Sequence, residues 1–173
     1  MGRRAEAFGL VAGLALLLAA VAAAAKPQAP GKAVASRYYV QNVTLSARPR
    51  GEAGASGAVT VCVDPSSDTV AYNFTALTLA DTPTKGQIRR GTAGATAVAF
   101  AAPGMIDPSV GEVEWNDATQ ATAAVVSQLT NGPRGFYVTV STRSHSKGAL
   151  FGRLTGWKKV SSDSEAASEC AFS

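Results

Sequence analysis

Two segments of the sequence share a pattern of glycines, polar side chains and basic side chains. The first, residues 84–94, reads Thr-Lys-Gly-Gln-Ile-Arg-Arg-Gly-Thr-Ala-Gly, and the second, residues 131–142, reads Asn-Gly-Pro-Arg-Gly-Phe-Tyr-Val-Thr-Val-Ser-Thr. Polar and apolar residues alternate in both, which is the two-residue period of a β-strand with one polar face. Guanidinium groups on such a face suit the recognition of carboxylate, sulfate or phosphate, because they form two parallel hydrogen bonds with these anions.

The candidate ligand-binding residues lie in and near these segments. We expect Gln87 and Arg89 to share one face of the first segment. Ser141 lies near the end of the second segment, and Arg143 and Arg153 follow it in the sequence. If the two segments are neighbouring strands, these side chains form a surface that binds anions. The alternative is that they are ordinary surface residues in cross-strand pairs.

Catalysis is not expected from this sequence. Its single histidine, His145, lies in the polar stretch Arg-Ser-His-Ser-Lys at residues 143–147, and a lone loop histidine supports neither a Ser-His-Asp arrangement nor a metal site. Glu112 and Glu114 would lie side by side on one strand face, whereas the carboxylates of a glycosidase face each other across a cleft. We therefore predict no catalytic residues, no metal ligands and no cofactor.

The N-terminal residues have the layout of a secretory signal peptide. Arg3 and Arg4 precede an apolar run over residues 8–21, and small alanines lead to a cleavage site at Ala25. This run is shorter than the roughly 20 apolar residues of a transmembrane helix. We expect residues 1–25 to be removed and the mature chain to be secreted without a membrane span. The mild net charge of +4 does not indicate nucleic-acid binding.

In a secreted chain, we expect the two cysteines to form a disulfide and two of the asparagines to be glycan acceptors. Cys62 and Cys170 are the only cysteines, and in an exported chain we expect them to pair. Their bond would tie the C-terminal tail, residues 159–173, to an early strand. Asn42 and Asn73 each begin an Asn-x-Thr tripeptide, the acceptor for an N-linked glycan. The alternation around Asn73 predicts that its side chain faces solvent.

The remaining pattern predicts one all-β domain over residues 37–158, preceded by a flexible segment over residues 26–36. Short runs rich in Val, Thr, Tyr and Phe are separated by Gly, Pro, Asp and Ser clusters, which is typical of a β-sandwich or barrel. The eight predicted strands cover about residues 37–45, 57–63, 69–78, 86–90, 96–101, 109–115, 135–142 and 149–157. We expect one short helix after the sixth strand, with Asn116 or Asp117 as its cap and its end at residues 131–133.

The two patterned segments, together with Gly-Ala-Leu-Phe-Gly-Arg-Leu at residues 148–154, resemble the chordin (CHRD) domain family. The corresponding family motifs are roughly Ala-His-Ile-His-x-Gly, Tyr-Val-Asn-Val-His-Thr and Gly-x-Ile-Arg-Gly-x-Leu, and the resemblance runs from about Tyr39 to Trp157. It implies an immunoglobulin-like Greek-key β-sandwich or barrel, with a limited likeness to copper/zinc superoxide dismutases. It also implies that the histidines of the family lie on one face, where they could hold a metal.

This sequence departs from the family at those histidines, because Gln87, Arg89 and Ser141 occupy their positions. Arginine cannot ligate a cation, and glutamine and serine are weak ligands for transition metals. The favoured hypothesis is a secreted, non-catalytic module whose partner is an extracellular protein or an acidic glycan. The alternative is a metal-binding or redox protein of superoxide-dismutase-like ancestry, which the missing histidines argue against.

Overall fold

The computed structural model describes residues 37–91, 94–101, 113–161 and 170. All of them belong to one compact unit of the chain, residues 34–173. The predicted signal peptide, the predicted flexible segment, Glu112 and most of the predicted C-terminal tail lie outside the described residues.

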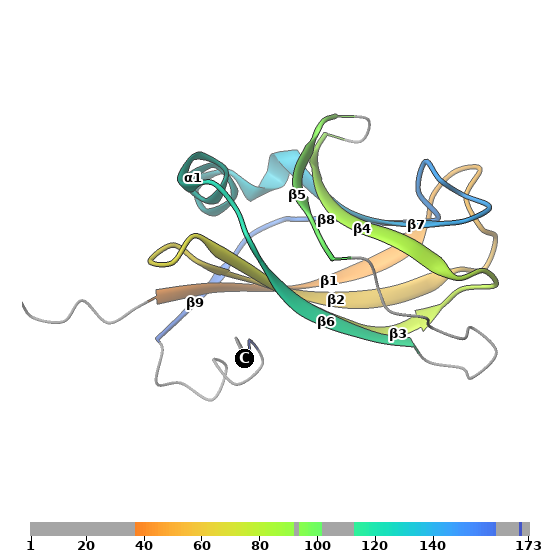
Figure 1. The fold of residues 1–173 in the computed structure, drawn as a ribbon, viewed down its shortest axis with the longest axis horizontal. Helices are drawn as coiled ribbons and strands as arrows, with labels where there is room; N and C mark the ends of the chain where they lie inside the picture. Colours follow the sequence, from red (N-terminus) through yellow and green to blue (C-terminus); the bar gives the residue numbers. More distant parts are fainter. Residues whose placement is uncertain (1–36, 92–93, 102–112, 162–169, 171–173) are drawn as a thin grey trace, which may run out of the picture. The chain divides into compact units, whose positions relative to one another are not determined.

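Nine strands and one short α-helix make up the described part of the chain (Figure 1). In chain order they are β1 (Arg37–Ala47), β2 (Ser56–Asp64), β3 (Thr69–Thr78), β4 (Pro83–Arg90), β5 (Thr96–Ala99), β6 (Val113–Gln120), α1 (Ala123–Asn131), the 3₁₀ turn η2 (Pro133–Gly135), β7 (Phe136–Thr142), β8 (Leu150–Arg153) and β9 (Lys158–Ser161). The strands form one antiparallel sheet in the order β5-β4-β7-β8-β1-β2-β3-β6. The strand β9 lies outside this order and pairs with the start of β1, whereas β8 pairs with the end of β1. The sheet curls until it is nearly closed. The prediction of an all-β fold with one short helix is confirmed.

The strand β6 extends further toward the C-terminus than the sequence predicts. It continues to Gln120, and Asn116 and Asp117, the predicted helix caps, pair with Asn73 and Tyr72 of β3. Pairing with β3 satisfies backbone hydrogen bonds along this segment. That gain outweighs a helix start that β-branched residues make weak. The predicted cap at either residue is therefore wrong.

The helix α1 begins later, with Thr122 as its N-cap. The Thr122 hydroxyl accepts a hydrogen bond from the backbone N–H of Val125 at 3.3 Å, the usual role of threonine at this position. Val126 and Leu129 are the buried side chains of the helix, and their spacing places them on one face. The helix ends at Asn131, where the Asn-Gly-Pro sequence predicts its end.

The C-terminal part of the domain also differs from the prediction. The last predicted strand, residues 149–157, is reduced to the four residues of β8, and β9 forms a further strand after it. Tyr38 in the first half of β1 lies opposite Val160 of β9, whereas β8 pairs with the other end of β1. Strands from the end of the domain therefore hold β1 at both of its ends.

Four aromatic rings in the core join strands from opposite ends of the sheet order. The rings of Tyr72 and Phe100 stack with centroids 4.0 Å apart, and those of Phe74 and Trp115 stack at 4.6 Å. Phe100 follows β5 and Trp115 lies in β6, the two terminal strands of the order. Gly86 of β4 lies against this cluster, because a Cβ atom there would clash with two of its rings. The stacked rings therefore connect the regions of β5 and β6, the two ends of the sheet, which are not joined by strand pairing in the described part of the chain.

Candidate functional site

The two patterned segments of the sequence, β4 and β7, are antiparallel neighbours, and β8 pairs with the other edge of β7. Ile88 and Val138 lie opposite each other on the inner side and are completely buried. The residues that alternate with them face outward. We call this outer surface the basic face, and its residues are Lys85, Gln87, Arg89, Tyr137, Thr139, Ser141, Phe151 and Arg153.

One cross-strand row of the basic face has an arginine on each side of a tyrosine. Arg89 of β4 and Arg153 of β8 both lie directly opposite Tyr137 of β7. The Arg153 guanidinium carbon lies 5.9 Å from the centroid of the Tyr137 ring, within cation–π range. Arg153 Nε donates to the Arg134 carbonyl at 3.1 Å, and Arg89 Nε donates to the Gly94 carbonyl at 2.9 Å. These contacts orient both guanidinium groups, and no described residue accepts a hydrogen bond from their terminal amino groups.

The polar residues next to this row are buried. Gln87 is 5% exposed, and its Oε1 atom accepts a hydrogen bond from the Thr96 hydroxyl of β5 at 2.8 Å. Thr139 lies directly opposite Gln87, and both Thr139 and Ser141 are 3% exposed. The structure thus places the predicted residues Gln87 and Ser141 on the same face as Arg89. Their burial favours support of the face over direct contact with a partner.

The predicted residue Arg143 lies beyond the end of β7, in an exposed turn that Asp81 holds in place. One carboxylate oxygen of Asp81 accepts hydrogen bonds from the Ser144 backbone N–H and hydroxyl at 2.7 and 2.8 Å. These hydrogen bonds are the main cause that lowers the pKa of Asp81 below its usual value, and the charge of Arg143 adds to it. His145 lies in the same turn, and its backbone N–H donates to the Thr142 hydroxyl at 3.2 Å. The turn is therefore built by hydrogen bonds at both of its ends.

A pocket of about 420 Å³ opens on the basic face and shares Tyr137 with the arginine row. This volume lies within the range of small-molecule sites. The pocket is lined by Arg48, Pro49, Arg50, Tyr137, Thr139 and Phe151. Sequence reasoning missed the three residues from the β1–β2 loop. The proline and the following glycine signal a turn there, but nothing local in the sequence indicates which strand that turn contacts.

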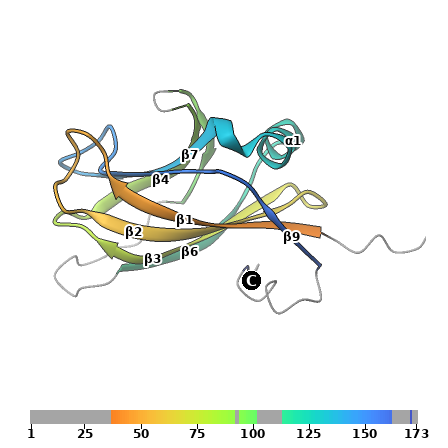
Figure 2. The same ribbon diagram turned by 180° about the vertical axis from the view of Figure 1, so that it is seen from behind.

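Hydrogen bonds dock the β1–β2 loop beside β8. The Arg48 backbone N–H donates to the Ala149 carbonyl at 3.0 Å, and the Arg48 guanidinium donates to the Lys147 carbonyl at 2.5 Å. The Gly51 N–H donates back to the Arg48 carbonyl at 2.6 Å and closes a tight turn. A Cβ atom on Gly51 would lie 2.7 Å from the Ala149 carbonyl oxygen, so this close approach requires glycine. Figures 1 and 2 both show the β1–β2 and β7–β8 loops side by side.

Basic and acidic residues are segregated along the chain, and the fold gathers the basic ones together. No Lys or Arg occurs between Arg50 and Lys85 or between Arg90 and Arg134, and these two intervals contain eight of the twelve acidic residues. The neighbouring strands β2, β3 and β6 lie in these intervals. The strands β4, β7 and β8 and the adjoining loops instead contain Arg48, Arg50, Lys85, Arg89, Arg90, Arg134, Arg143, Lys147 and Arg153. The side of the domain that carries the pocket is therefore positively charged.

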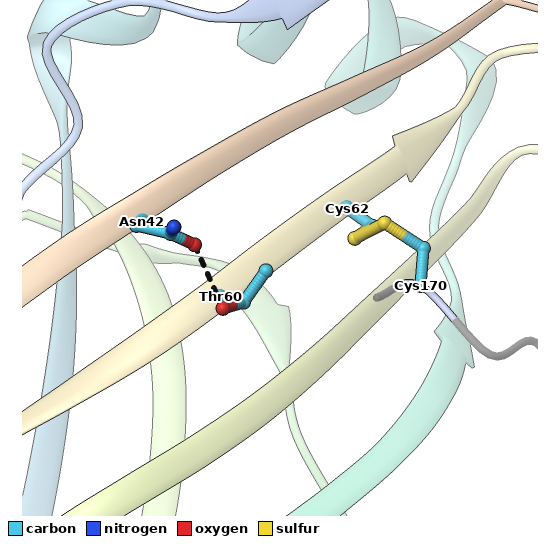
Figure 3. Close-up of a disulfide and its surroundings, with 4 residues drawn as sticks. All are labelled: Asn42, Thr60, Cys62 and Cys170. Carbon is cyan, nitrogen blue, oxygen red and sulfur yellow. Dashed lines mark hydrogen bonds between the residues drawn. A yellow bond between two sulfur atoms is a disulfide. The ribbon is translucent and has the colours of Figure 1, made fainter. Parts of the chain in front are cut away.

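A disulfide lies on the outer surface of the part of the sheet formed by β1, β2 and β3 (Figure 3). Cys62 of β2 bonds to Cys170, with the two Cα atoms 5.8 Å apart. Cys62 packs there with Val40, Ala71 and Val160 in a small apolar cluster that is separate from the main core. The bond attaches the end of the chain to this face of the sheet.

The two predicted glycan acceptors lie on the same outer surface. Asn42 is exposed, and its Oδ1 atom accepts a hydrogen bond from the Thr60 hydroxyl at 2.8 Å (Figure 3). Thr60 also lies directly opposite Asn73 of β3, so one cross-strand row contains both asparagines. Asn73 is half-buried, and its Oδ1 atom has no hydrogen-bond partner among the described residues. The structure therefore gives the two asparagines different surroundings.

Metal-ligating side chains do not gather in the described part of the chain, where no group of three or more His, Cys, Asp or Glu residues could hold an ion. Gln87, Arg89 and Ser141, which stand where the resemblance implies histidines, do lie on one face. Their chemistry there is that of an amide, a guanidinium and a buried hydroxyl. The geometry that the resemblance implies is present, but the donor set suits an anion rather than a cation.

These features define a small all-β module with one disulfide and a positively charged outer face. A family model described as "CHRD domain" matches residues 40–154, and the chain belongs to the CHRD domain family. This family is typically extracellular. No curated protein and no solved structure matches the chain. Among the described residues, no helix has the length and apolar character that a membrane crossing requires.

Proposed function

We propose that the protein is a secreted, non-catalytic module that binds an acidic extracellular partner through its basic face. The observation that carries this proposal is the segregation of charge, which collects nine of the twelve Lys and Arg residues in the described part of the chain around β4, β7 and β8. A surface with charges of one sign attracts partners of the opposite sign and orients them as they approach. The extracellular character of the family supports the proposed compartment.

The two acidic residues in the loops next to the basic face, Glu52 and Asp81, do not pair with Arg89 or Arg153. Glu52 is buried, and its carboxylate accepts a hydrogen bond from the Ala80 backbone N–H. Asp81 is engaged by the turn that follows β7. No carboxylate among the described residues forms an ion pair with Arg89 or Arg153. Both guanidinium groups therefore keep donors for an external anion.

An acidic glycan suits the basic face better than a protein does. A typical protein–protein interface has an apolar core inside a polar rim. On the basic face the exposed side chains are cationic, and the apolar contacts are confined to the pocket. Sulfates and carboxylates spaced along a polysaccharide match separate guanidinium groups, each of which forms paired hydrogen bonds. The partner we propose is an acidic glycan, and an acidic protein is the other outcome of the test.

The second candidate, a metal-binding or redox protein, requires ligands that this face does not offer. Arg89 places a positive charge where a cation would bind, and a guanidinium has no lone pair to donate. Gln87 and Ser141 beside it are weak ligands for transition metals. We keep anion binding as the proposed activity of the face.

Retention on an immobilised sulfated glycan tests the proposal. The secreted protein should be retained at low salt and released as the ionic strength rises, because salt screens exposed charge pairs. Arg153→Gln should elute at lower salt than the wild type, since it removes an oriented guanidinium from the basic face. Lys158→Gln is the matched control, because Lys158 is exposed on β9 and its loss removes the same charge outside the basic face.

Each outcome of this experiment decides between the partners. A wild-type protein that passes the glycan column unretained contradicts the glycan as partner, as does equal elution of the two variants. Retention on immobilised polyglutamate, but not on the glycan, with the same dependence on Arg153 would identify an acidic protein instead.

A further inference from the structure

The pocket on the basic face combines flat apolar walls with positive charge. Two aromatic rings and a proline form the walls, Thr139 also lines the pocket, and two arginines from the β1–β2 loop contribute the charge. We propose that this pocket holds one acidic sugar ring, a uronate or a sulfated hexose, of the glycan chain that binds the basic face. This inference rests on the proposed function and assigns a subsite within it.

Arg50 occupies a backbone conformation that normally belongs to glycine. In the turn closed by Gly51 and Arg48, Pro49 holds the second position and Arg50 the third, with a φ angle of 66°. Turns with proline second and a positive φ third usually have glycine at the third position, because glycine adopts this φ without strain. The exposed Arg50 side chain has no partner among the described residues that would explain the arginine. An anion bound in the pocket would account for an arginine at this strained position.

The pocket is assembled before any ligand arrives. Arg48 fastens the turn through its own backbone N–H and its guanidinium, which donate to the Ala149 and Lys147 carbonyls. On the other side, Phe151 and Thr139 lie directly opposite each other on two paired strands. A ligand therefore does not have to order the β1–β2 loop, and this lowers the entropy cost of binding.

An acidic sugar fits this chemistry better than an acidic peptide. The C–H faces of a sugar ring pack on aromatic rings, while a carboxylate or sulfate on the ring reaches a guanidinium. An aspartate or glutamate side chain carries the charge but has no ring to occupy a pocket of about 420 Å³. The row of Arg89, Tyr137 and Arg153 meets the pocket at its central residue, Tyr137. The rest of the glycan chain can therefore continue across the basic face.

Arg50→Gly tests the pocket because it separates binding from folding. Glycine relieves the strained φ, so the melting temperature should stay equal or rise. The Kd for a soluble sulfated disaccharide that contains a uronate should rise about tenfold, because a charge-assisted hydrogen bond is lost. Arg50→Gln removes the charge but keeps the strain, and it should weaken binding to the same extent. Calorimetric titration gives the Kd, and a thermal scan gives the melting temperature.

Two control variants and one wall variant complete the design. Asp68→Gly relieves the same kind of strain, a φ of 54°, in the turn between β2 and β3. Lys158→Gln removes one positive charge on β9. Both should bind the disaccharide with the wild-type Kd. Phe151→Ala removes an apolar wall whose side chain is only half-buried, so the domain should fold and bind the disaccharide more weakly.

The outcomes separate this inference from the proposed function. Disaccharide binding that is unchanged in Arg50→Gly and Arg50→Gln overturns the pocket, while retention of the wild type on the long glycan leaves the proposed function in place. Displacement of the disaccharide by a glutamate peptide of equal charge at equal concentration also overturns the pocket, because charge alone would then determine occupancy. Disaccharide binding without retention on the long glycan supports the pocket and contradicts the extended basic face.

Discussion

The guanidinium of Arg153 lies over the ring of Tyr137, with its Cζ atom 5.9 Å from the ring centroid. The two residues are directly opposite each other on β8 and β7, so the register of one strand pair brings the charge to the ring. The Arg134 carbonyl accepts a hydrogen bond from Arg153 Nε at 3.1 Å. An exposed arginine, normally free to change rotamer, is thus oriented by a ring and a carbonyl.

Replacing Tyr137 with leucine should weaken anion binding without unfolding the domain. Leucine keeps apolar bulk but removes the ring face, and an exposed cation–π contact is worth about 0.5–1 kcal/mol. Arg153 then loses one of the two contacts that orient it, and the variant should leave the sulfated-glycan column at lower salt. Tyr137→Phe keeps the ring and is the matched control. Identical elution of the two variants would show that the ring does not orient Arg153.

Acid should destabilise the domain partly through Asp81. The hydrogen bonds from Ser144 lower the pKa of Asp81 in the folded state, relative to an unfolded value of about 3.9. A lowered folded pKa means that the carboxylate stabilises the fold above the unfolded value and loses this contribution as the pH falls through the folded pKa. Asp81→Asn should therefore show a weaker decline of the urea midpoint below about pH 4.

The pH experiment has an internal reference and a control. Burial raises the pKa of Asp64, but hydrogen bonds from two serines outweigh it, so this pKa is also lowered. Asp64 should leave a residual acid dependence in Asp81→Asn. Ser144→Ala, which removes the hydroxyl that donates to Asp81 Oδ2, is the matched control and should weaken the acid dependence in the same direction. If Asp81→Asn keeps the wild-type slope, the turn after β7 does not depend on the ionised carboxylate.

Removing the disulfide should make the domain markedly less stable. Cys62 and Cys170 are 108 residues apart, and the chain-entropy argument gives roughly 4–5 kcal/mol for a loop of about this length, as an upper figure. The double variant Cys62→Ala/Cys170→Ala should lose about 2–5 kcal/mol in the free energy of unfolding, measured with urea. The wild type unfolded in reductant should match it. A double variant as stable as the oxidised wild type would show that the cross-link does not constrain the chain.

The two predicted glycan acceptors should differ in occupancy. Asn42 is exposed, and its Oδ1 is engaged by Thr60, which leaves Nδ2 as the group available for a glycan. Asn73 is half-buried with its Oδ1 buried, so a glycan there would have to displace its surroundings. In protein secreted from eukaryotic cells, Asn42→Gln should remove one glycan by intact mass, and Asn73→Gln should remove none. A loss of mass in Asn73→Gln would contradict this assignment.

Local alternation in the sequence was enough to determine which side of a strand faces the core. Ile88 is completely buried between Gln87 and Arg89, which face outward. Val138 is likewise completely buried between Tyr137 and Thr139, which face outward. These predictions hold because the two-residue period is a property of the strand backbone itself and needs no information about neighbouring strands. The family motifs added the fold class and the family.

Only the tertiary structure decided which outward side chains meet. The register of β7 with β4 and β8 places Tyr137 between Arg89 and Arg153. The β1–β2 loop reaches the pocket through a contact between Arg48 and Lys147, 99 residues apart in the sequence. The start of the helix also moved, because pairing of β6 with β3 took up the residues predicted as its cap. Each of these outcomes depends on which distant strands pair and in which register, and a local pattern of alternation is compatible with many such pairings.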